Sequence, residues 1–358
     1  MGIEEALRLI DLAVRHKLNT LLVEYGPRRR FANHPDLQAS DALTQAEMER
    51  LTRAAESDGL QIIPLQQTAA HLEYVLTNPR FANLRERPEK PNLLCPWHPD
   101  ALPLMKDLLL EIRALHPQAR YIHIGGDEAR KLGVCPSCRA SGLSPAELYG
   151  RHMAALARFV LEMGCRPIVW DDTFCAFPSA LQHLPKETII DYWDYIAVAD
   201  PTPVIIPRMA HANGGPRVAH HWRWMLSPDR RRLSDVQVGV MRSYSHPTLL
   251  PFALGRAYLT EFRRYLGDGF PKWIRALPYL EYYQQQGFDV ITSPTAMGNG
   301  DMNDGTPNFA RFAANIELHA RRCKENGRSL GLITTAWYNM PPELLEQPLI
   351  QTAQVTCW

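Results

Sequence analysis

The sequence contains no hydrophobic run long enough to cross a membrane, and it has almost no net charge. Its 39 Lys and Arg residues nearly balance 38 Asp and Glu residues, which gives a formal net charge of +1. A basic cluster at 230–232 is short and is followed by polar sequence. Because a membrane span needs about 20 apolar residues and nucleic-acid binding needs an extended basic surface, we expect neither a membrane nor a nucleic acid as partner.

The sequence also lacks a disulfide framework among its 7 cysteines, and the start of the chain shows no basic residues followed by an apolar stretch. The cysteines lack the even number and regular spacing of a disulfide framework: Cys95, Cys135, Cys138, Cys165, Cys175, Cys323 and Cys357. We therefore expect free thiols in a reducing compartment, with the cytoplasm as the location.

Cys135 and Cys138 form the one short-spaced cysteine pair, and it follows closely on an acidic motif described below. A structural zinc site needs four ligands, which Cys95 and His98 could complete. The favoured interpretation is free thiols in a loop, so the sequence predicts no metal and no cofactor, with the zinc site as the alternative.

Alternating helical and strand patterns are the main feature that is present. Helical periodicity and short apolar runs predict helices at 3–16, 44–58, 99–115, 146–163, 277–286 and 309–325, and strands at 18–25, 60–65, 121–124, 167–170, 188–193, 288–292 and 330–336. Strands that are apolar throughout and separated by amphipathic helices indicate a parallel sheet covered on both faces. This leaves a closed barrel or an open doubly wound sheet.

We predict the α/β class and a TIM (β/α)8 barrel whose first strand is not evident, because the chain opens on a helix and shows seven strands. The region at about 199–269 is too long and irregular for an ordinary connection. We predict a single catalytic barrel domain over 1–358 with an insertion there. We expect the insertion to form a lid or an oligomer contact, which leaves a homo-oligomer open.

Two adjacent carboxylates, Asp127 and Glu128, follow the apolar strand at 121–124 after two glycines. The carboxyl ends of barrel strands face the active site, and glycines there allow a ligand or a neighbouring backbone to approach closely. We therefore interpret both acids as catalytic residues. The alternative is a turn followed by the acids of a helix start, which are common because of the helix dipole.

Polar and aromatic residues also cluster at the ends of the other predicted strands. Sugars stack their apolar faces on aromatic rings and bind fixed polar groups, so this composition indicates a carbohydrate pocket. The residues are Glu24, Tyr25, Gln66, Gln67, His71, Trp170, Asp171, Asp172, Tyr192, Trp193, Asp194 and Trp337. His71 and His123 could bond to the acidic pair or lie as satisfied histidines in the core, and each Trp taken alone could be a core residue.

The segment from His123 to Glu128 resembles the His-X-Gly-Gly-Asp-Glu motif of glycoside hydrolase family 20, the β-N-acetylhexosaminidases, where X is apolar. The resemblance covers most of the chain outside about 199–269 and includes the segments 21–25, 63–76, 84–86 and 331–337. It implies hydrolysis of a terminal β-linked GalNAc or GlcNAc, in which the 2-acetamido oxygen of the sugar forms an oxazolinium intermediate. The partner would be a carbohydrate that carries a 2-acetamido sugar.

The resemblance also implies separate roles for the site residues. Glu128 would be the general acid and later the base, and Asp127, ionised, would orient the acetamido group. Asp301 would keep a family role after the seventh strand, and Trp337 would form a wall of the acetamido pocket. Asn299 or Tyr192 would replace a family tyrosine, and Asn339 stands in place of a glutamate, which leaves the choice of sugar open.

The substrate-binding residues predicted from both lines of reasoning are His71, His123, Trp170, Asp171, Trp193, Asp301 and Trp337. Two further functions remain open at this point. One is another retaining barrel glycosidase with Asp171, Asp172 or Asp194 as nucleophile. The other is a sugar-binding barrel without catalytic activity.

Overall fold

The computed structural model describes residues 2–129, 131–195, 205–206, 275–276, 279–297, 302–303, 306–307, 309–337 and 342–356. Apart from Ile205 and Ile206, the predicted insertion at 199–269 lies outside these residues, as does Asp301. The chain divides into two compact units, Met1–Ile190 and Asp191–Trp358, which are described separately below. The prediction of a single domain over 1–358 stays a prediction.

A parallel sheet runs through the first unit. Its strands follow the order β1 (Thr20–Glu24), β2 (Gln61–Leu65), β5 (Tyr121–His123) and β6 (Arg166–Trp170), followed by β7 (Ile189–Trp193), which crosses the boundary between the units. The register pairs Glu24 with Leu65 and Leu65 with His123. The carboxyl ends of β1, β2 and β5 therefore meet at one edge, where the polar residues that follow these strands are gathered.

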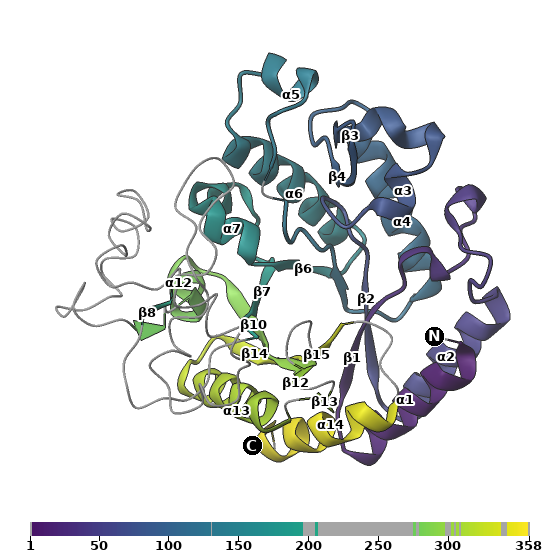
Figure 1. Ribbon diagram of the computed structural model, residues 1–358, viewed down its shortest axis with the longest axis vertical. Coiled ribbons are helices and arrows are strands. Elements are labelled where there is room, and N and C mark those ends of the chain that lie inside the picture. The colour runs from purple at the N-terminus through teal and green to yellow at the C-terminus, as the bar shows by residue number, and fades with distance from the viewer. Residues whose placement is uncertain are drawn as a thin grey trace. The chain divides into compact units, whose positions relative to one another are not determined.

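Amphipathic helices cover the outer side of these strands (Figure 1): α1 (Ile3–Arg15), α2 (Gln45–Ser57), α4 (Ala101–Leu115) and α6 (Pro145–Glu162). Capping boxes start two of them, with Thr44 and Glu47 at α2 and Ser144 and Glu147 at α6. A buried cluster joins α1, α2 and β2 through Ile10, Ala13, Leu51, Ala55, Leu60 and Ile62. The helices and strands predicted in this unit are confirmed to within a few residues.

Short elements that the hydrophobic pattern did not predict lie between these helices and strands. They are the 3-10 turns η1 (Gly26–Arg28), η2 (Pro35–Leu37), η3 (Pro79–Leu84) and η4 (Pro178–His183), the hairpin β3 (Arg85–Arg87) and β4 (Lys90–Leu94), and the helices α3 (Glu73–Leu76), α5 (Pro136–Ala140) and α7 (Asp172–Ala176). The β3–β4 hairpin is antiparallel. Several of these elements hold the site described below.

A buried ion pair fixes the loop that follows β1. Arg29 is 0% exposed, and its Nη1 lies 3.1 Å from Oε2 of Glu111 on α4. Arg29 Nη2 also donates to Oε1 of Gln66 at 3.2 Å, while Gln66 Nε2 donates to the hydroxyl of Tyr74. Gln66, one of the polar residues at the predicted strand ends, thus serves this buried network.

The second unit holds α12 (Tyr279–Gln285), β10 (Asp289–Ser293), α13 (Phe309–Glu325), β14 (Ser329–Leu332) and α14 (Pro342–Thr356). β10 and β14 are parallel neighbours, and β11 (Thr295–Met297) pairs in parallel with β15 (Thr335–Ala336). The strand predicted at 330–336 is therefore two strands, because the chain leaves one pairing at Ile333 and Thr334 before it enters the next. The remaining pairs are β8 (Ile205–Ile206) with β9 (Arg275–Ala276), and β12 (Met302–Asn303) with β13 (Thr306–Pro307).

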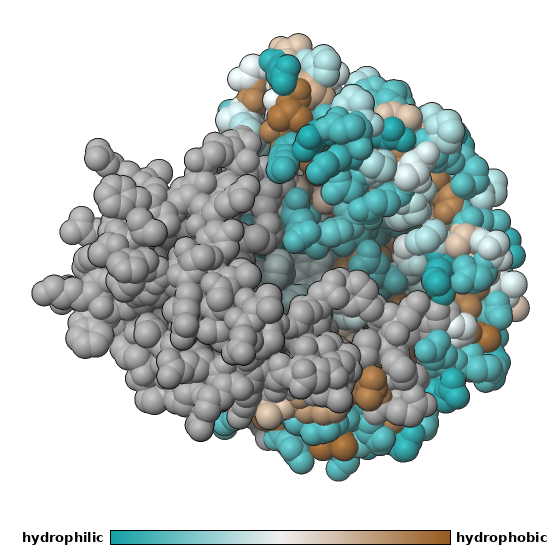
Figure 2. All heavy atoms as spheres, viewed as in Figure 1, coloured by the Kyte–Doolittle hydropathy of each residue, from teal (hydrophilic) through white to brown (hydrophobic). Residues whose placement is uncertain are grey.

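The described surface is mostly hydrophilic in the view of Figure 2, with hydrophobic residues scattered over it. The large exposed hydrophobic residues are Trp97, Leu110, Val134 and Leu330. No helix in the described ranges is both long and apolar enough to span a membrane.

Candidate active site

A tight backbone turn presents the two acids at the end of β5. Gly125 and Gly126 have φ values of +65° and +98°, and Glu128 has φ +55°. A Cβ on Gly125 would lie 2.0 Å from Oε1 and 3.1 Å from Cα of Gln67, so any other residue would force the buried Gln67 to move. A left-handed glutamate costs on the order of 1–3 kcal/mol and persists only where its surroundings hold it.

Asp127 and Glu128 themselves lie in the turn, and the next helix of the described residues, α5, begins at Pro136. The alternative of a turn followed directly by a helix start is therefore wrong. The strand-end position predicted from the two glycines is confirmed.

His71 joins the two acids. Its Nε2 atom lies 3.1 Å from Oδ2 of Asp127 and 3.6 Å from Oε2 of Glu128. The side chain of Asp127 is 14% exposed, whereas that of Glu128 is 48% exposed. The hydrogen bond to Asp127 is the main reason why the pKa of His71 rises to about 9 against the opposing effect of burial. At neutral pH His71 is therefore a cation between two carboxyl groups.

Two side chains at the start of α7, Asp172 and Thr173, accept hydrogen bonds from the backbone of the turn. Oδ2 of Asp172 accepts the backbone N–H of Glu128 at 3.0 Å, and the hydroxyl oxygen of Thr173 accepts that of Ala129 at 3.2 Å. The hydroxyl of Tyr149 donates to the carbonyl of Gly126 at 2.8 Å. These bonds keep Glu128 in its left-handed conformation.

Glu24 brings a third carboxyl group to this edge of the sheet. Its pKa is raised to about 7, first by the protein atoms that displace solvent around it and then by the negative charge of Asp127. Gln67 forms a side-chain hydrogen bond to it, and the charge of His71 opposes the rise. Glu24 as a whole residue is exposed, so the displacement of solvent is confined to the surroundings of its carboxyl group. Glu24 therefore changes protonation state in the neutral range beside the acidic pair.

His123, Trp170 and Asp171 lie beneath the turn. His123 is 0% exposed, its Nδ1 accepts the backbone N–H of Gly125 at 3.0 Å, and its ring centroid lies 4.4 Å from that of Trp170. Trp170 and Asp171 are 1% and 0% exposed. Such positions suit residues that support the turn, and direct contact of these three residues with a sugar stays a prediction.

The second unit contains a separate aromatic cluster. Trp193 lies 4.8 Å from Tyr195 between ring centroids, and Trp337 Nε1 donates to the Tyr195 hydroxyl at 2.6 Å. The two tryptophans were predicted as substrate-binding residues, whereas Tyr195 was not predicted. Tyr192 is buried, and its hydroxyl accepts from Arg322 at 3.3 Å. Asp301 and Asn299 lie outside the described residues.

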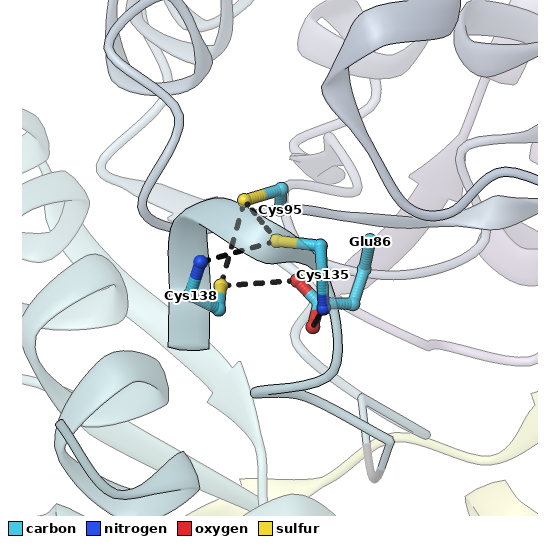
Figure 3. A group of neighbouring side chains, drawn as sticks. All are labelled: Glu86, Cys95, Cys135 and Cys138. Atoms are coloured by element: carbon cyan, nitrogen blue, oxygen red, sulfur yellow. Dashed lines mark hydrogen bonds between the residues drawn. The ribbon is translucent and has the colours of Figure 1, made fainter. Parts of the chain in front are cut away.

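Among the described residues, one group has the composition of a metal site (Figure 3). It consists of Glu86, Cys95, Cys135 and Cys138, whose ligand atoms all lie within 4.8 Å of one another. The three cysteines are free thiols, as expected. His98 is not a member: its Nε2 lies 3.4 Å from Asn83 Nδ2, and its Nδ1 accepts from the backbone of Asp100. Glu86 takes the fourth place instead, a residue that sequence reasoning did not consider as a ligand.

Comparisons with known proteins find relatives in one family. A model of the glycosyl hydrolase family 20 catalytic domain matches residues 6–203. The chain is 31% identical over 192 residues to hexosaminidase D from Bos taurus and 33% identical over 198 residues to hexosaminidase D from Homo sapiens. Each alignment covers 51% of this chain, and they cover 56% of the bovine and 40% of the human protein. The chain thus matches about half of the length of these relatives.

Solved structures share the fold at low identity. A β-N-acetylhexosaminidase from Bacteroides fragilis is similar over 98% of this chain and 62% of its own, with a TM-score of 0.58 and 16% identity. An exo-β-N-acetylglucosaminidase from Vibrio harveyi is similar over 100% of this chain and 52% of its own, with a TM-score of 0.59 and 17% identity. The predicted TIM-barrel fold is confirmed. Because the family model matches more than half of the chain, including the turn with Asp127 and Glu128, the chain belongs to glycosyl hydrolase family 20.

Proposed function

We propose that the chain is a retaining exo-glycosidase that hydrolyses terminal β-linked N-acetylhexosamine, either GalNAc or GlcNAc, through an oxazolinium intermediate. The observation that carries the proposal is that Asp127 and Glu128 both approach one atom, Nε2 of His71, at 3.1 and 3.6 Å. Carboxylates that converge in this way reach a bound sugar from the same side. In the ordinary retaining mechanism the two groups act on opposite faces about 5–5.5 Å apart, one as nucleophile.

A nucleophile within the substrate removes the need for a carboxylate on the opposite face. The 2-acetamido oxygen attacks the anomeric carbon while the bond to the leaving oxygen breaks and that oxygen takes a proton. Water then opens the oxazolinium ring and restores the acetamido group. Two inversions at the anomeric carbon retain its configuration.

Asp127 suits the task of holding the acetamido group. His71 binds its Oδ2, while its Oδ1 is buried and has no hydrogen-bond partner among the described residues. A buried acceptor of this kind is costly unless a ligand supplies the donor, and the acetamido N–H is a donor of the right type. The carboxylate of Asp127 can then stabilise the positive charge that develops on the acetamido group.

Glu128 suits the proton transfers. Its side chain is 48% exposed, so it can reach a leaving-group oxygen, and its backbone N–H is held by Asp172. It would protonate the leaving oxygen first and deprotonate the attacking water afterwards. Glu24, whose pKa is about 7, adds a pH-dependent charge that interacts with Asp127.

The burial of Asp171 and Asp172 argues against a protein nucleophile at these positions. They are 0% and 3% exposed, and Asp172 already accepts the backbone N–H of Glu128. A nucleophile has to reach the anomeric carbon of a bound sugar. Neither carboxylate offers that access.

The test compares aryl β-GalNAc, β-GlcNAc and β-glucoside as substrates of the wild type, Glu128→Gln and Asp127→Asn. We expect turnover of at least one 2-acetamido substrate and none of the glucoside. Glu128→Gln should lower kcat/KM by about 10²–10⁴-fold, and Asp127→Asn by about 10²–10³-fold. Glu49→Gln, an exposed residue of α2, is the control that should leave turnover unchanged.

Three outcomes would contradict the proposal. Equal cleavage of the glucoside would exclude substrate assistance, and a covalent sugar adduct on an aspartate would indicate a protein nucleophile. Binding of a thiazoline mimic of the intermediate, without turnover of any 2-acetamido substrate, would indicate a sugar-binding protein.

A further inference from the structure

The cluster of Glu86, Cys95, Cys135 and Cys138 lies apart from the acidic pair, and the hydrolysis proposed above makes no use of it. All four side chains are buried, with exposures of 0%, 2%, 7% and 1%. Cys95 Sγ lies 3.3 Å from Cys135 Sγ and 3.5 Å from Cys138 Sγ, and Cys138 Sγ lies 3.1 Å from Oε2 of Glu86. Figure 3 shows the three sulfur atoms and this carboxylate oxygen turned toward one another.

We propose that these four residues bind a structural zinc ion. With Zn–S bonds of about 2.3 Å, the sulfur atoms of a tetrahedral site are separated by roughly 3.8 Å, close to the distances found here. Three thiolates exclude magnesium and calcium, which take oxygen ligands, and the single carboxylate distinguishes the set from the four cysteines of a common iron–sulfur cluster.

Glu86 gives the strongest indication of a cation. Its Oε1 accepts the backbone N–H groups of Val134 and Cys135 at 2.5 and 3.1 Å, which leaves Oε2 pointing at the three sulfur atoms. A carboxylate that is 0% exposed is costly to bury without a positive partner, and thiols supply none. A divalent ion bound to the thiolates and to Oε2 supplies that charge.

The surroundings match those of a closed structural site. The Cys-X-X-Cys loop brings the backbone N–H of Cys138 to 3.2 Å from Sγ of Cys135, so the loop closes tightly around the sulfur atoms. Leu148 is buried in one hydrophobic cluster with the three cysteines, and the partly buried Leu143 packs against that cluster. All four positions around the ion would be filled by protein ligands, which is typical of a structural rather than a catalytic zinc site.

The ion would connect the segments that carry His71 and Glu128. Glu86 belongs to β3 and Cys95 follows β4. Cys135 caps the start of α5 after the loop that leads away from Glu128, and Cys138 lies within α5. On its other edge β4 holds the segment around His71, because the Leu94 N–H donates to Ala69 O at 2.9 Å and the Leu72 N–H donates to Asn92 O at 3.3 Å. Binding of zinc therefore fixes two segments that meet at the acidic pair.

Elemental analysis of the purified full chain, after dialysis against metal-free buffer, tests the proposal. We expect about one zinc per chain, bound by thiolates. Zinc should be lost in Cys135→Ser and Cys138→Ser and bound more weakly in Glu86→Gln. Cys165→Ser is the matched control and should keep the zinc, since Cys165 is also buried but its thiol donates to the Ala119 carbonyl.

A second measurement on the wild type does not depend on how the variants fold. A mercurial reagent that reacts with thiols should release the zinc to a coloured chelator, and removal of zinc should lower the unfolding temperature. Absence of metal together with a thiol count that reveals a disulfide among the three cysteines would overturn the proposal. So would iron with sulfide in place of zinc, or a full zinc content in the Cys135→Ser variant.

Discussion

Replacing His71 by asparagine removes the cation from between Asp127 and Glu128. Asparagine is the suitable substitute because His71 has φ +54°, a conformation that asparagine tolerates better than most residues. The variant keeps a polar side chain but cannot carry a positive charge. It therefore isolates the contribution of the imidazolium to the site.

The size of the stabilisation by protonated His71 follows from its pKa, which is raised from 6.5 to about 9. At about 1.4 kcal/mol per pKa unit, this shift corresponds to roughly 3 kcal/mol of preference for the protonated form. The side chain is 38% exposed, so solvent screening reduces the expected contribution to roughly 1–2 kcal/mol. Because the pKa in the folded chain is the higher one, the stabilisation is complete below pH 6.5 and is lost as the pH rises through about 9.

An NMR titration of the histidine ring protons measures the shift directly. The signal of His71 is the one that is missing in His71→Asn, and we expect its midpoint near pH 9. In Asp127→Asn the midpoint should fall, because the hydrogen bond to Asp127 is the largest cause of the shift. A wild-type midpoint near 6.5, or a midpoint that does not respond to Asp127→Asn, would refute this reasoning.

Two predictions concern stability and are checked by urea unfolding of the variants. The free energy of unfolding should fall by roughly 1–3 kcal/mol more in Gly125→Ala than in Gly142→Ala. Both glycines have a similar positive φ, but only Gly125 has no room for a Cβ, which would meet Gln67; equal losses would contradict the steric argument. Glu111→Gln should lower the free energy of unfolding by about 3–5 kcal/mol, because it leaves the buried guanidinium of Arg29 without its carboxylate. Glu4→Gln, which breaks an exposed ion pair with Arg50, should lower it by less than about 1 kcal/mol. Similar losses of unfolding free energy in Glu111→Gln and Glu4→Gln would refute the argument that burial makes an ion pair costly to break.

The central elements of the fold could be predicted because apolar runs and helical periodicity are local properties of a sequence. β2, β5, β6 and β10 are short runs of buried residues, and their predicted positions agree with the structure. The β3–β4 hairpin was missed because its sequence is charged and short. Glu86 stands between two arginines and looks like part of a solvated segment, yet it is fully buried.

The residues at the strand ends also show what local sequence cannot predict. Trp170 ends a buried strand and Asp171 follows it, as predicted, but the sequence alone does not say whether a side chain there faces a pocket or the protein interior. Packing decided this question, since both are buried beneath the turn that carries the acids. Tyr195 was missed for the opposite reason: nothing in the local sequence indicates that its hydroxyl accepts a bond from the distant Trp337.

The sequence by itself determined where the acidic pair lies. An apolar strand followed by Gly125 and Gly126 predicts a turn at the strand end, because glycine adopts a positive φ at little cost, and both residues do so in the structure. Only the tertiary structure decided the surroundings of that pair, because they come from separate parts of the chain. His71 bridges the two carboxylates, and Glu86 completes the cysteine cluster, through contacts that form only when the strands and loops are packed together.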